Sequence, residues 1–385
     1  MQRRKTHEVR VGNIGIGGNN PVRVQSMCTT STMDTDGCVQ QILAIAAAGG
    51  ELVRLTTQGV REAENMKIIR DRVRAAGCMV PLVADVHFNP AAADVAALYC
   101  EKVRINPGNY VDPGRTFKKL EYTDEEYAAE LTKIEDRLVP FLNICREHHT
   151  AVRIGVNHGS LSDRIMSRYG DTPAGIVESC MEFLRVCMKQ QFMDVVVSIK
   201  ASNTVVMVES VRLLVKAMDA EGMTFPLHLG VTEAGEGEDG RLKSAVGIGA
   251  LLVDGIGDTI RVSLSEPPEN EIPVAYALLQ AARVRQTKTE YISCPGCGRT
   301  LYDLQETIRK VKAATQHLTG LKIGIMGCIV NGPGEMADAD YGYVGAGRGR
   351  ISLYRGKECV EKNIPEEDAV DHLLRLIDND RINKK

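Results

Sequence analysis

The chain has 385 residues, of which 44% are hydrophobic and 25% charged, and its formal net charge at pH 7 is -3. This composition is ordinary for a globular protein, and the charge gives no indication of a nucleic-acid partner. No apolar run reaches transmembrane length, and no apolar segment follows the basic N-terminus, as a signal peptide would require. We therefore expect a cytoplasmic protein with no membrane partner.

Eight short runs rich in Val and Ile recur in the first part of the chain, and helical periodicity separates most of them. The runs lie at 21–27, 51–57, 81–88, 102–108, 151–159, 194–203, 227–237 and 257–266. Strand–helix alternation indicates parallel strands, and eight units in roughly 250 residues match a (β/α)8 TIM-type barrel. The alternative, a doubly wound open sheet, would need a glycine-rich turn after the first strand, and "SMCTTSTMDTDG" is not one. A hairpin in "VGNIGIGGNNP" could cover the bottom of the barrel.

The pattern changes after Pro268. One further helix, in "EIPVAYALLQAARV", is followed by a helix, a strand, a Gly-rich turn and strands centred on the hairpin-like "GAGRGR". We predict a barrel over residues 1–284, with the substrate site, and a small α+β domain over residues 285–385.

Four of the predicted strands carry an arginine between aliphatic residues, and a fifth ends in a lysine. These cations are Arg54, Arg104, Arg153, Arg261 and Lys200. Because a buried unpaired cation is costly, several of them at similar depth need a common anion. Strand ends converge at the mouth of a barrel, and guanidinium groups suit phosphate oxygens. We infer a small substrate with one phosphate or more, and this much positive charge favours a diphosphate. The alternative is a ring of internal salt bridges with Asp85 and Glu233 as partners.

The same strand ends carry other polar residues. They are Asp85, His87, Asn157, His158, Ser202, Asn203, Glu233 and Ser263. Among these residues, Asn203 is a candidate for substrate binding. Glu233 places an acidic group where a phosphate loop would carry none, so it suits a proton donor or a hydroxyl-binding residue, unless it forms a structural ion pair. The two histidines are more typical of structural roles.

Eleven cysteines are present, and in a reducing compartment a disulfide framework is not expected. Seven of them stand singly among apolar or helical residues and are predicted to be small core side chains. These are Cys28, Cys38, Cys78, Cys100, Cys145, Cys180 and Cys187.

The other notable cysteines are the C-x2-C pair Cys294 and Cys297 in "SCPGCG", and Cys328 in "IMGCIVNGPGE". A zinc ribbon would need a second C-x2-C or paired histidines, and a thioredoxin-type pair would lie at the start of a helix. Three thiolates without a well-spaced fourth favour a [4Fe-4S] cluster with one unusual ligand. Zinc and unliganded thiols remain alternatives. The amides of Gly327 and "NGPG" could donate hydrogen bonds to cluster sulfurs.

Several long motifs together resemble the (E)-4-hydroxy-3-methylbut-2-enyl diphosphate synthase family of the methylerythritol phosphate route to isoprenoids. They are "ISCPGCGRTLYDLQ", "GIMGCIVNGPGE", "VRIGVNHGSLSDRI", "SIKASN" and "HLGVTEAGEG", and the resemblance runs from about residue 7 to about residue 365. It implies an iron–sulfur oxidoreductase that reduces 2-C-methyl-D-erythritol 2,4-cyclodiphosphate with two electrons, opening the ring and removing a hydroxyl group as water.

The resemblance also implies roles for individual residues. The ligands of a [4Fe-4S] cluster fall on Cys294, Cys297, Cys328 and Glu335, and Glu335 is also a catalytic candidate. Glu233 matches an acidic residue that faces the reacting hydroxyls, and Asn331 matches an asparagine near the cluster. Diphosphate-binding positions fall on Arg54, Arg104, Arg153, Asn157, Lys200, Arg261 and Ser263.

The implied partners are ferredoxin or flavodoxin as electron donor, since no flavin or nicotinamide motif is present, and a second subunit. The expected homodimer has the cluster domain of one subunit capping the barrel of the other. One departure bears on this: the motifs look most like the plant and chlamydial branch, which usually carries a large domain between barrel and cluster domain. Here only residues 269–292 separate "SLSEPP" from "SCPGC". The site could therefore form in cis or in trans, and the two-domain layout favours trans.

Two other functions fit the residues. One is a redox sensor whose barrel binds a phosphorylated metabolite, and the other is a zinc-stabilised phospho-sugar isomerase that uses the barrel alone.

Overall fold

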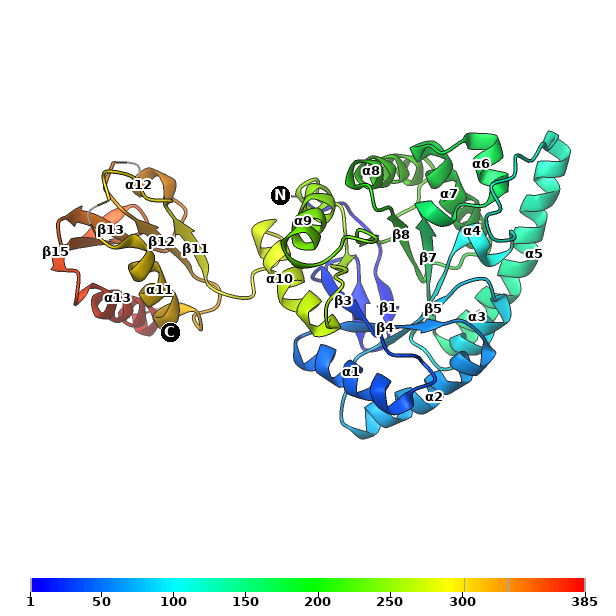
Figure 1. Ribbon diagram of the computed structural model, residues 1–385, viewed down its shortest axis with the longest axis horizontal. Helices are drawn as coiled ribbons and strands as arrows, with labels where there is room; N and C mark the ends of the chain where they lie inside the picture. Colours follow the sequence, from blue (N-terminus) through cyan, green and yellow to red (C-terminus); the bar gives the residue numbers. More distant parts are fainter. Residues whose placement is uncertain (1, 301, 331, 384–385) are drawn as a thin grey trace. The chain divides into compact units, whose positions relative to one another are not determined.

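The computed structural model describes residues 2–300, 302–330 and 332–383. The chain divides into two compact units, Met1–Val284 and Arg285–Lys385 (Figure 1). Each unit has its own sheet and its own hydrophobic core. No helix in the described ranges is both long enough and apolar enough to cross a membrane.

The first unit is a nearly closed barrel of eight parallel strands. Their order around the sheet is β8-β7-β6-β5-β4-β3-β10-β9, and a parallel bridge between Val197 and Leu227 joins the two ends. This ring confirms the predicted barrel and excludes the open sheet. The strands are β3 (Arg23–Met27), β4 (Leu52–Thr57), β5 (Leu82–Val86), β6 (Lys102–Ile105), β7 (Ala151–Asn157), β8 (Val195–Lys200), β9 (His228–Leu229) and β10 (Thr259–Ile260).

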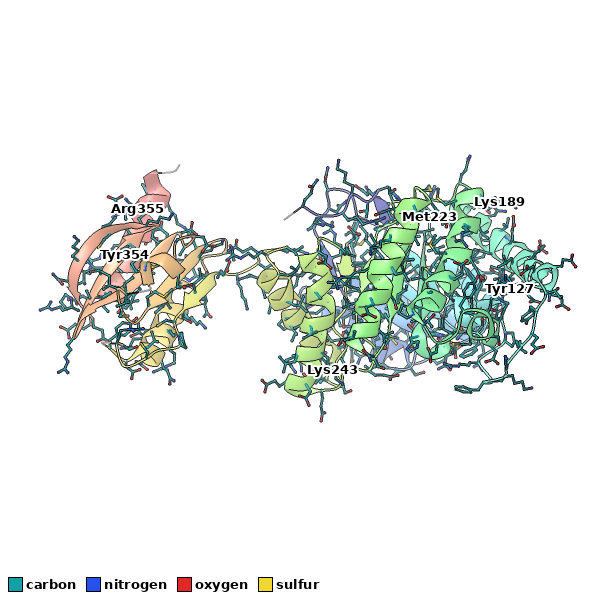
Figure 2. The ribbon with its side chains drawn as sticks, turned by 90° about the horizontal axis from the view of Figure 1, so that it is seen from above. Tyr127, Lys189, Met223, Lys243, Tyr354 and Arg355 are labelled. Atoms are coloured by element: carbon teal, nitrogen blue, oxygen red, sulfur yellow. The ribbon has the colours of Figure 1, made fainter. Side chains whose placement is uncertain are left out.

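Helices surround the strands (Figure 1). Several of them carry side-chain caps at their N-termini; Thr123, for example, forms a capping box with Glu126 at the start of α5. Polar side chains such as Lys189 and Lys243 are exposed on the outer surface (Figure 2). The helices are α1 (Thr35–Ala47), α2 (Val60–Ala75), α3 (Pro90–Ala97), α4 (Pro107–Tyr110), α5 (Asp124–His148), α6 (Asp163–Tyr169), α7 (Pro173–Lys189), α8 (Thr204–Ala220), α9 (Gly237–Val253) and α10 (Glu271–Ala281), with 3-10 turns at His158–Ser160 and Pro268–Asn270.

A hairpin of β1 (Val9–Val11) and β2 (Ile14–Ile16) closes the bottom of the barrel, as predicted. It packs against Leu52, Val83, Ala151 and Val196, which lie at or near the beginnings of four strands. Alternate residues of a strand share one face, so the residues two positions further along also face the barrel interior. The fold therefore directs the strand-embedded cations inward.

The seven cysteines predicted for the core pack there. Six are buried, and Cys78 is partly buried against the same core. Burial raises the pKa of the Cys187 thiol to about 12, so it stays protonated and behaves as a small apolar side chain.

The second unit is a five-stranded sheet in the order β11-β12-β13-β14-β15, parallel over its first three strands and antiparallel over the rest. The "GAGRGR" hairpin joins β13 to β14, as predicted. Neither the first strand nor the C-terminal helix was anticipated from the sequence. The elements are β11 (Glu290–Ser293), α11 (Leu304–Thr315), β12 (Lys322–Met326), α12 (Gly332–Glu335), β13 (Tyr341–Gly347), β14 (Arg350–Arg355), β15 (Glu358–Pro365) and α13 (Ala369–Asn383).

Candidate functional site

A cavity of about 220 Å³ lies at the C-terminal ends of the barrel strands. Of the nine barrel residues predicted for the site, seven line it: Arg54, Arg104, Asn157, Lys200, Glu233, Arg261 and Ser263. Asp85, His87 and Thr232 complete the lining. The C-terminal end of the strands is where barrel enzymes place their active sites.

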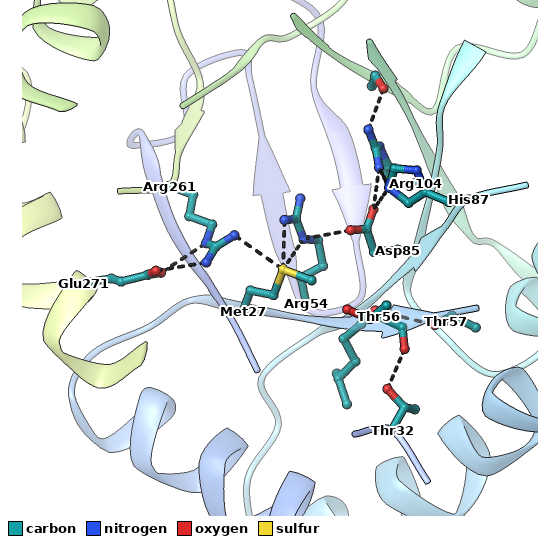
Figure 3. A network of polar contacts seen from close by, with 12 residues as sticks. Met27, Thr32, Arg54, Thr56, Thr57, Asp85, His87, Arg104, Arg261 and Glu271 are labelled. Atoms are coloured by element: carbon teal, nitrogen blue, oxygen red, sulfur yellow. Dashed lines mark hydrogen bonds and ion pairs between the residues drawn. The ribbon is translucent and has the colours of Figure 1, made fainter. Parts of the chain in front are cut away.

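Buried ion pairs hold three of the four strand arginines. Asp85 accepts from Arg104 Nη1 at 2.9 Å and lies 3.5 Å from Arg54 Nε, while Glu271 pairs with Arg261 at 2.9 Å (Figure 3). Burial alone would raise the pKa of Asp85, but Arg54 and Arg104 hold it well below its usual range. The salt-bridge alternative is thus right about Asp85, although Glu271, not Glu233, is the second acid.

Met27 lies between two of these guanidinium groups. Its Sδ accepts from Arg54 Nη2 at 2.9 Å and from Arg261 Nη1 at 3.3 Å (Figure 3). A thioether is a weak acceptor, so these N–H groups would bind a phosphate oxygen more strongly. Nothing in the sequence motifs indicated Met27 or Glu271, because both act only through their positions in the fold.

Lys200 differs from the arginines. It is 4% exposed, and no described residue forms a hydrogen bond or ion pair with its Nζ. A Cβ at Gly230 would lie 2.7 Å from this ammonium group, so glycine leaves room for it. Burial lowers the pKa of Lys200, and Arg54 and Arg153 lower it further. A bound anion would stabilise the charged ammonium.

Glu233 lies at the rim of the cavity. It is exposed and its φ is 54°, in the left-handed region that costs energy for residues other than glycine. Such strain often occurs at functional positions. No ion pair to an arginine is found for Glu233 in the described part of the chain.

His87 also lines the cavity, and its imidazole ring is neutral. Arg104 can only donate, so His87 Nε2 must accept from it. Burial and the Arg104 charge lower the pKa of His87 to about 4, which agrees with a neutral ring. The sequence placed His87 at this strand end, but its residue type did not separate it from a structural histidine. His158, in contrast, pairs with Asp171 and does not line the cavity.

Two predicted residues do not reach the cavity lining. Arg153 is 1% exposed and stands in register with Arg104 on the neighbouring strand. Asn203 caps α8, where its side chain accepts from the amides of Val205 and Val206. Their roles in substrate binding stay predictions.

A second candidate site is a pocket of about 360 Å³ in the smaller unit. Cys294, Cys297, Cys328 and Glu335 all line it. The four residues come from loops and from short α12, after the ends of β11 and β12. All three thiols are free, and Cys297 and the carboxylate are exposed.

Backbone amides and Thr300 lie close to the cysteines of this pocket. Gly327 donates its amide hydrogen to Cys294 Sγ at 3.1 Å, which fits the amide–sulfur bond expected from the sequence. A Cβ at Gly327 would lie 2.7 Å from Thr300 Oγ1, so the position requires glycine. Thr300 in turn closes the loop, since its Oγ1 accepts from Cys297 N and its amide donates to Cys297 O.

The three thiols and the carboxylate of this pocket suit a four-iron cluster better than a single metal ion. Within the described ranges, no three His, Cys, Asp or Glu side chains are grouped closely enough to hold one metal ion. A four-iron cluster is larger, and each of its ligands binds a different iron. The pocket is lined by three thiols and one carboxylate, and thus offers the expected donors. Asn331, predicted to lie near the cluster, is outside the described residues.

The protein thus combines two units. One is a TIM barrel whose cavity is lined by cations that suit phosphate groups, and the other is an α+β unit whose pocket is lined by cysteines. Residues 6–276 match the GcpE TIM-barrel domain, and residues 290–379 match the GcpE protein C-terminal domain. The chain therefore belongs to the GcpE family.

Two relatives illustrate the similarity. The chain is 48% identical, over 98% of its length and 98% of the relative, to the 4-hydroxy-3-methylbut-2-en-1-yl diphosphate synthase (flavodoxin) of Bacteroides thetaiotaomicron. It is 53% identical, over 99% of its length and 96% of the relative, to the corresponding synthase (ferredoxin) of Parasynechococcus marenigrum. The first alignment spans 601 positions, more than the 385 residues of this chain, so that relative carries residues with no counterpart here.

Proposed function

We propose that this chain reduces 2-C-methyl-D-erythritol 2,4-cyclodiphosphate to (E)-4-hydroxy-3-methylbut-2-enyl diphosphate in isoprenoid precursor biosynthesis. The reaction opens the cyclic diphosphate and removes a hydroxyl group as water, with uptake of two electrons. The observation that carries the proposal is the convergence of Arg54, Arg104, Lys200 and Arg261 on one cavity in a GcpE family member. The curated relatives are named as synthases of this diphosphate.

The cavity residues would bind and orient the diphosphate. Phosphate oxygens would replace Met27 as acceptors from Arg54 and Arg261 and would pair with the Lys200 ammonium. Asn157 and Ser263 offer further donors at the cavity wall. A substrate that enters with its phosphates first would leave its hydroxyl groups near the rim.

Glu233 stands at that rim and would donate a proton to the departing hydroxyl group or hold it by a hydrogen bond. Arg153, buried in register with Arg104, would add positive potential to the cavity. Asn203, at the start of α8, and Asn331, beside the cluster ligands in sequence, complete the proposed substrate contacts.

In the smaller unit, Cys294, Cys297, Cys328 and Glu335 would hold a [4Fe-4S] cluster. Such a cluster, when bound, supplies electrons to the substrate one at a time. The Gly327 amide would stabilise negative charge on the Cys294 sulfur. Glu335 is a harder ligand than the three thiolates and would bind iron less tightly, so it is the ligand suited to exchange.

Anaerobic turnover tests the proposal directly. The full chain with reconstituted cluster is reduced by an artificial reductant and mixed with the cyclic diphosphate. We expect reoxidation of the cluster together with formation of the open diphosphate. A colourless zinc protein would contradict the proposal. A cluster that the cyclic diphosphate fails to reoxidise would instead indicate a sensor. Glu335→Ala should slow turnover and leave the stability of the barrel unchanged.

The electron donor is proposed to be a ferredoxin or a flavodoxin, the two donors named for the relatives. Comparing anaerobic turnover with each reduced donor identifies the better one.

We further infer a homodimer in which the smaller unit of one subunit completes the barrel site of its partner. Mixing two impaired variants, Cys328→Ser and Lys200→Met, at a substrate concentration too low to saturate the second, tests this arrangement. Mixed dimers regain activity only if the two sites come from different chains. No recovery after verified subunit exchange would indicate a site formed within one chain.

A further inference from the structure

Helix α9 carries a row of apolar residues on its outer surface. Leu242, Val246 and Val253 are 55%, 60% and 57% exposed, and Ala245 is exposed beside them. Their spacing of three, four and seven residues places them on one face of the helix. Gly249 lies on the same face, where an added Cβ would meet no described atom within 4 Å. These five residues form the α9 face, and contiguous apolar surface of this kind is typical of an interaction site.

The inner side of α9 is apolar as well. Ile248, Leu251 and Leu252 are buried in the barrel core. A surface helix normally has a charged outer side, whereas a helix that is apolar all round is normally buried on both sides. Neighbouring α10, which packs against α9, has no charged residue after the buried Glu271. These features indicate that another surface covers the α9 face.

Charged residues of opposite sign lie at the two ends of this face. Glu238 and Asp239 are exposed in the first turn of α9, and neither has an ion pair among the described residues. At the other end, Arg212 of α8 lies 2.7 Å from Asp254, the residue that follows α9. Lys216 is exposed one turn further along α8 and also has no ion pair in the described part of the chain. The surface is thus acidic at the start of α9, apolar in the middle and basic beyond its end.

This order of charges fits a second copy of the same surface. When two identical helices pack antiparallel around a twofold axis, the start of each lies beside the end of the other. Leu242 would then lie opposite Val253 of the partner subunit, and Val246 opposite the partner's Gly249. The small residues Ala245 and Gly249 would allow the two helices to approach closely. The acidic start of one α9 would face the basic end beside the other, so the two surfaces are complementary in charge.

We propose that the α9 face binds the α9 face of a second copy of this chain. The inference deepens the homodimer inferred above and rests on it. Stable interfaces bury about 800 Å² on each partner, which is more than one helical row offers, so α8 and α10 must contribute. Because α10 is the last helix before the barrel unit ends at Val284, a partner on this face lies beside the segment that leaves the barrel. Such a position is what a site shared between two subunits requires.

Sedimentation velocity of the full chain tests the interface. We expect Val246→Glu to raise the Kd of the dimer at least about 100-fold, because a carboxylate would be buried without a partner. Ile68→Glu is the matched control, since Ile68 is a 51% exposed side chain on α2, which packs between α1 and α3. This control should leave the Kd unchanged. An unmodified chain that sediments as a monomer would overturn the proposal, and so would a dimer that Val246→Glu does not weaken.

Charge reversal then identifies what covers the face. Asp239→Lys should raise the Kd of the dimer about 10-fold, and adding Lys216→Glu to the same chain should restore it, because opposite charges again face each other across the interface. All these substitutions change exposed side chains, and circular dichroism checks that each variant is folded. If the second substitution weakens the dimer further, the proposed antiparallel pairing is wrong. A monomer that floats with phosphatidylcholine vesicles would overturn the proposal and assign the face to a membrane.

Turnover separates this inference from the proposed reaction. Val246→Glu should lose activity at concentrations where it is a monomer and should keep the pyrophosphate affinity of its barrel. A monomeric Val246→Glu with full turnover would support the α9 interface and contradict a site shared between subunits. An unmodified monomer that converts the cyclic diphosphate would overturn the α9 interface and leave the proposed reaction intact.

Discussion

The two candidate sites are built in different ways. The barrel cavity takes its cations from rigid strands, where buried ion pairs such as Arg104–Asp85 fix their positions before any substrate arrives. The pocket of the smaller unit takes its ligands from loops and one short helix, and Cys297 and Glu335 are exposed. The first site is therefore preorganised by the fold, whereas the second would be completed by what it binds. Substitutions should affect stability in the barrel and cofactor retention in the smaller unit.

The largest effect is expected for Cys328→Ser. Loss of one thiolate ligand should reduce turnover at least about 100-fold and lower the iron content, because a hydroxyl group is a poor ligand for this metal. Pyrophosphate binding to the barrel should be unchanged. Iron analysis, visible absorption and anaerobic assays measure these effects. Cys359→Ser is the matched control, since Cys359 lies outside the pocket lining. A variant that kept both its cluster and full turnover would refute the ligand assignment.

The next effect concerns the barrel. Asp85→Asn removes the acid shared by Arg54 and Arg104 and leaves two buried cations without it. We expect the free energy of unfolding to fall by about 3–5 kcal/mol, as is typical when one partner of a buried ion pair is removed. Chemical denaturation followed by circular dichroism measures the change. If stability is unaffected, the cavity is not preorganised by this pair.

Lys200→Met, in the same cavity, should weaken diphosphate binding without lowering the stability of the barrel. Because Lys200 has no partner in the described structure, its removal should not destabilise the barrel. Loss of a charge-assisted contact should weaken diphosphate binding by about 10- to 100-fold. Pyrophosphate titration by calorimetry, together with a melting curve, separates the two effects. A lower Tm with unchanged affinity would assign Lys200 a structural role.

The smallest effect is a pH dependence. The pKa of His87 is about 4 in the folded protein, below its ordinary value of 6.5. Between these values the unfolded chain binds more protons, so the free energy of unfolding falls as the pH drops. The contribution of His87 should decrease by about 2 kcal/mol between pH 7.5 and pH 5. The stability difference between the unmodified protein and His87→Gln at the two pH values measures it. A difference independent of pH would contradict the neutral, half-buried imidazole.

Much of the cavity was predictable because barrel geometry is regular. Once eight strands are recognised, the side chains at their C-terminal ends must meet, and this placed Arg54, Arg104, Lys200 and Arg261 together. Arg153 shows the limit of this reasoning. Its strand carries the same local phrase and it stands in register with Arg104, yet its buried side chain is not part of the cavity lining.

The pairing of charges could not be read from the sequence. Glu271 pairs with Arg261 across a turn after the last strand, and its position in the sequence carries no motif. Met27 became an acceptor for two guanidinium groups only because its strand lies between β4 and β10.

The sequence by itself determined the strand–helix alternation, the division near residue 285, the cysteine motif and the family, because each is encoded in local pattern or in residues close in the chain. The tertiary structure decided which cations are paired, which line the cavity and which are buried outside its lining. Those properties depend on strand register and burial, which arise only when segments distant in sequence pack against one another.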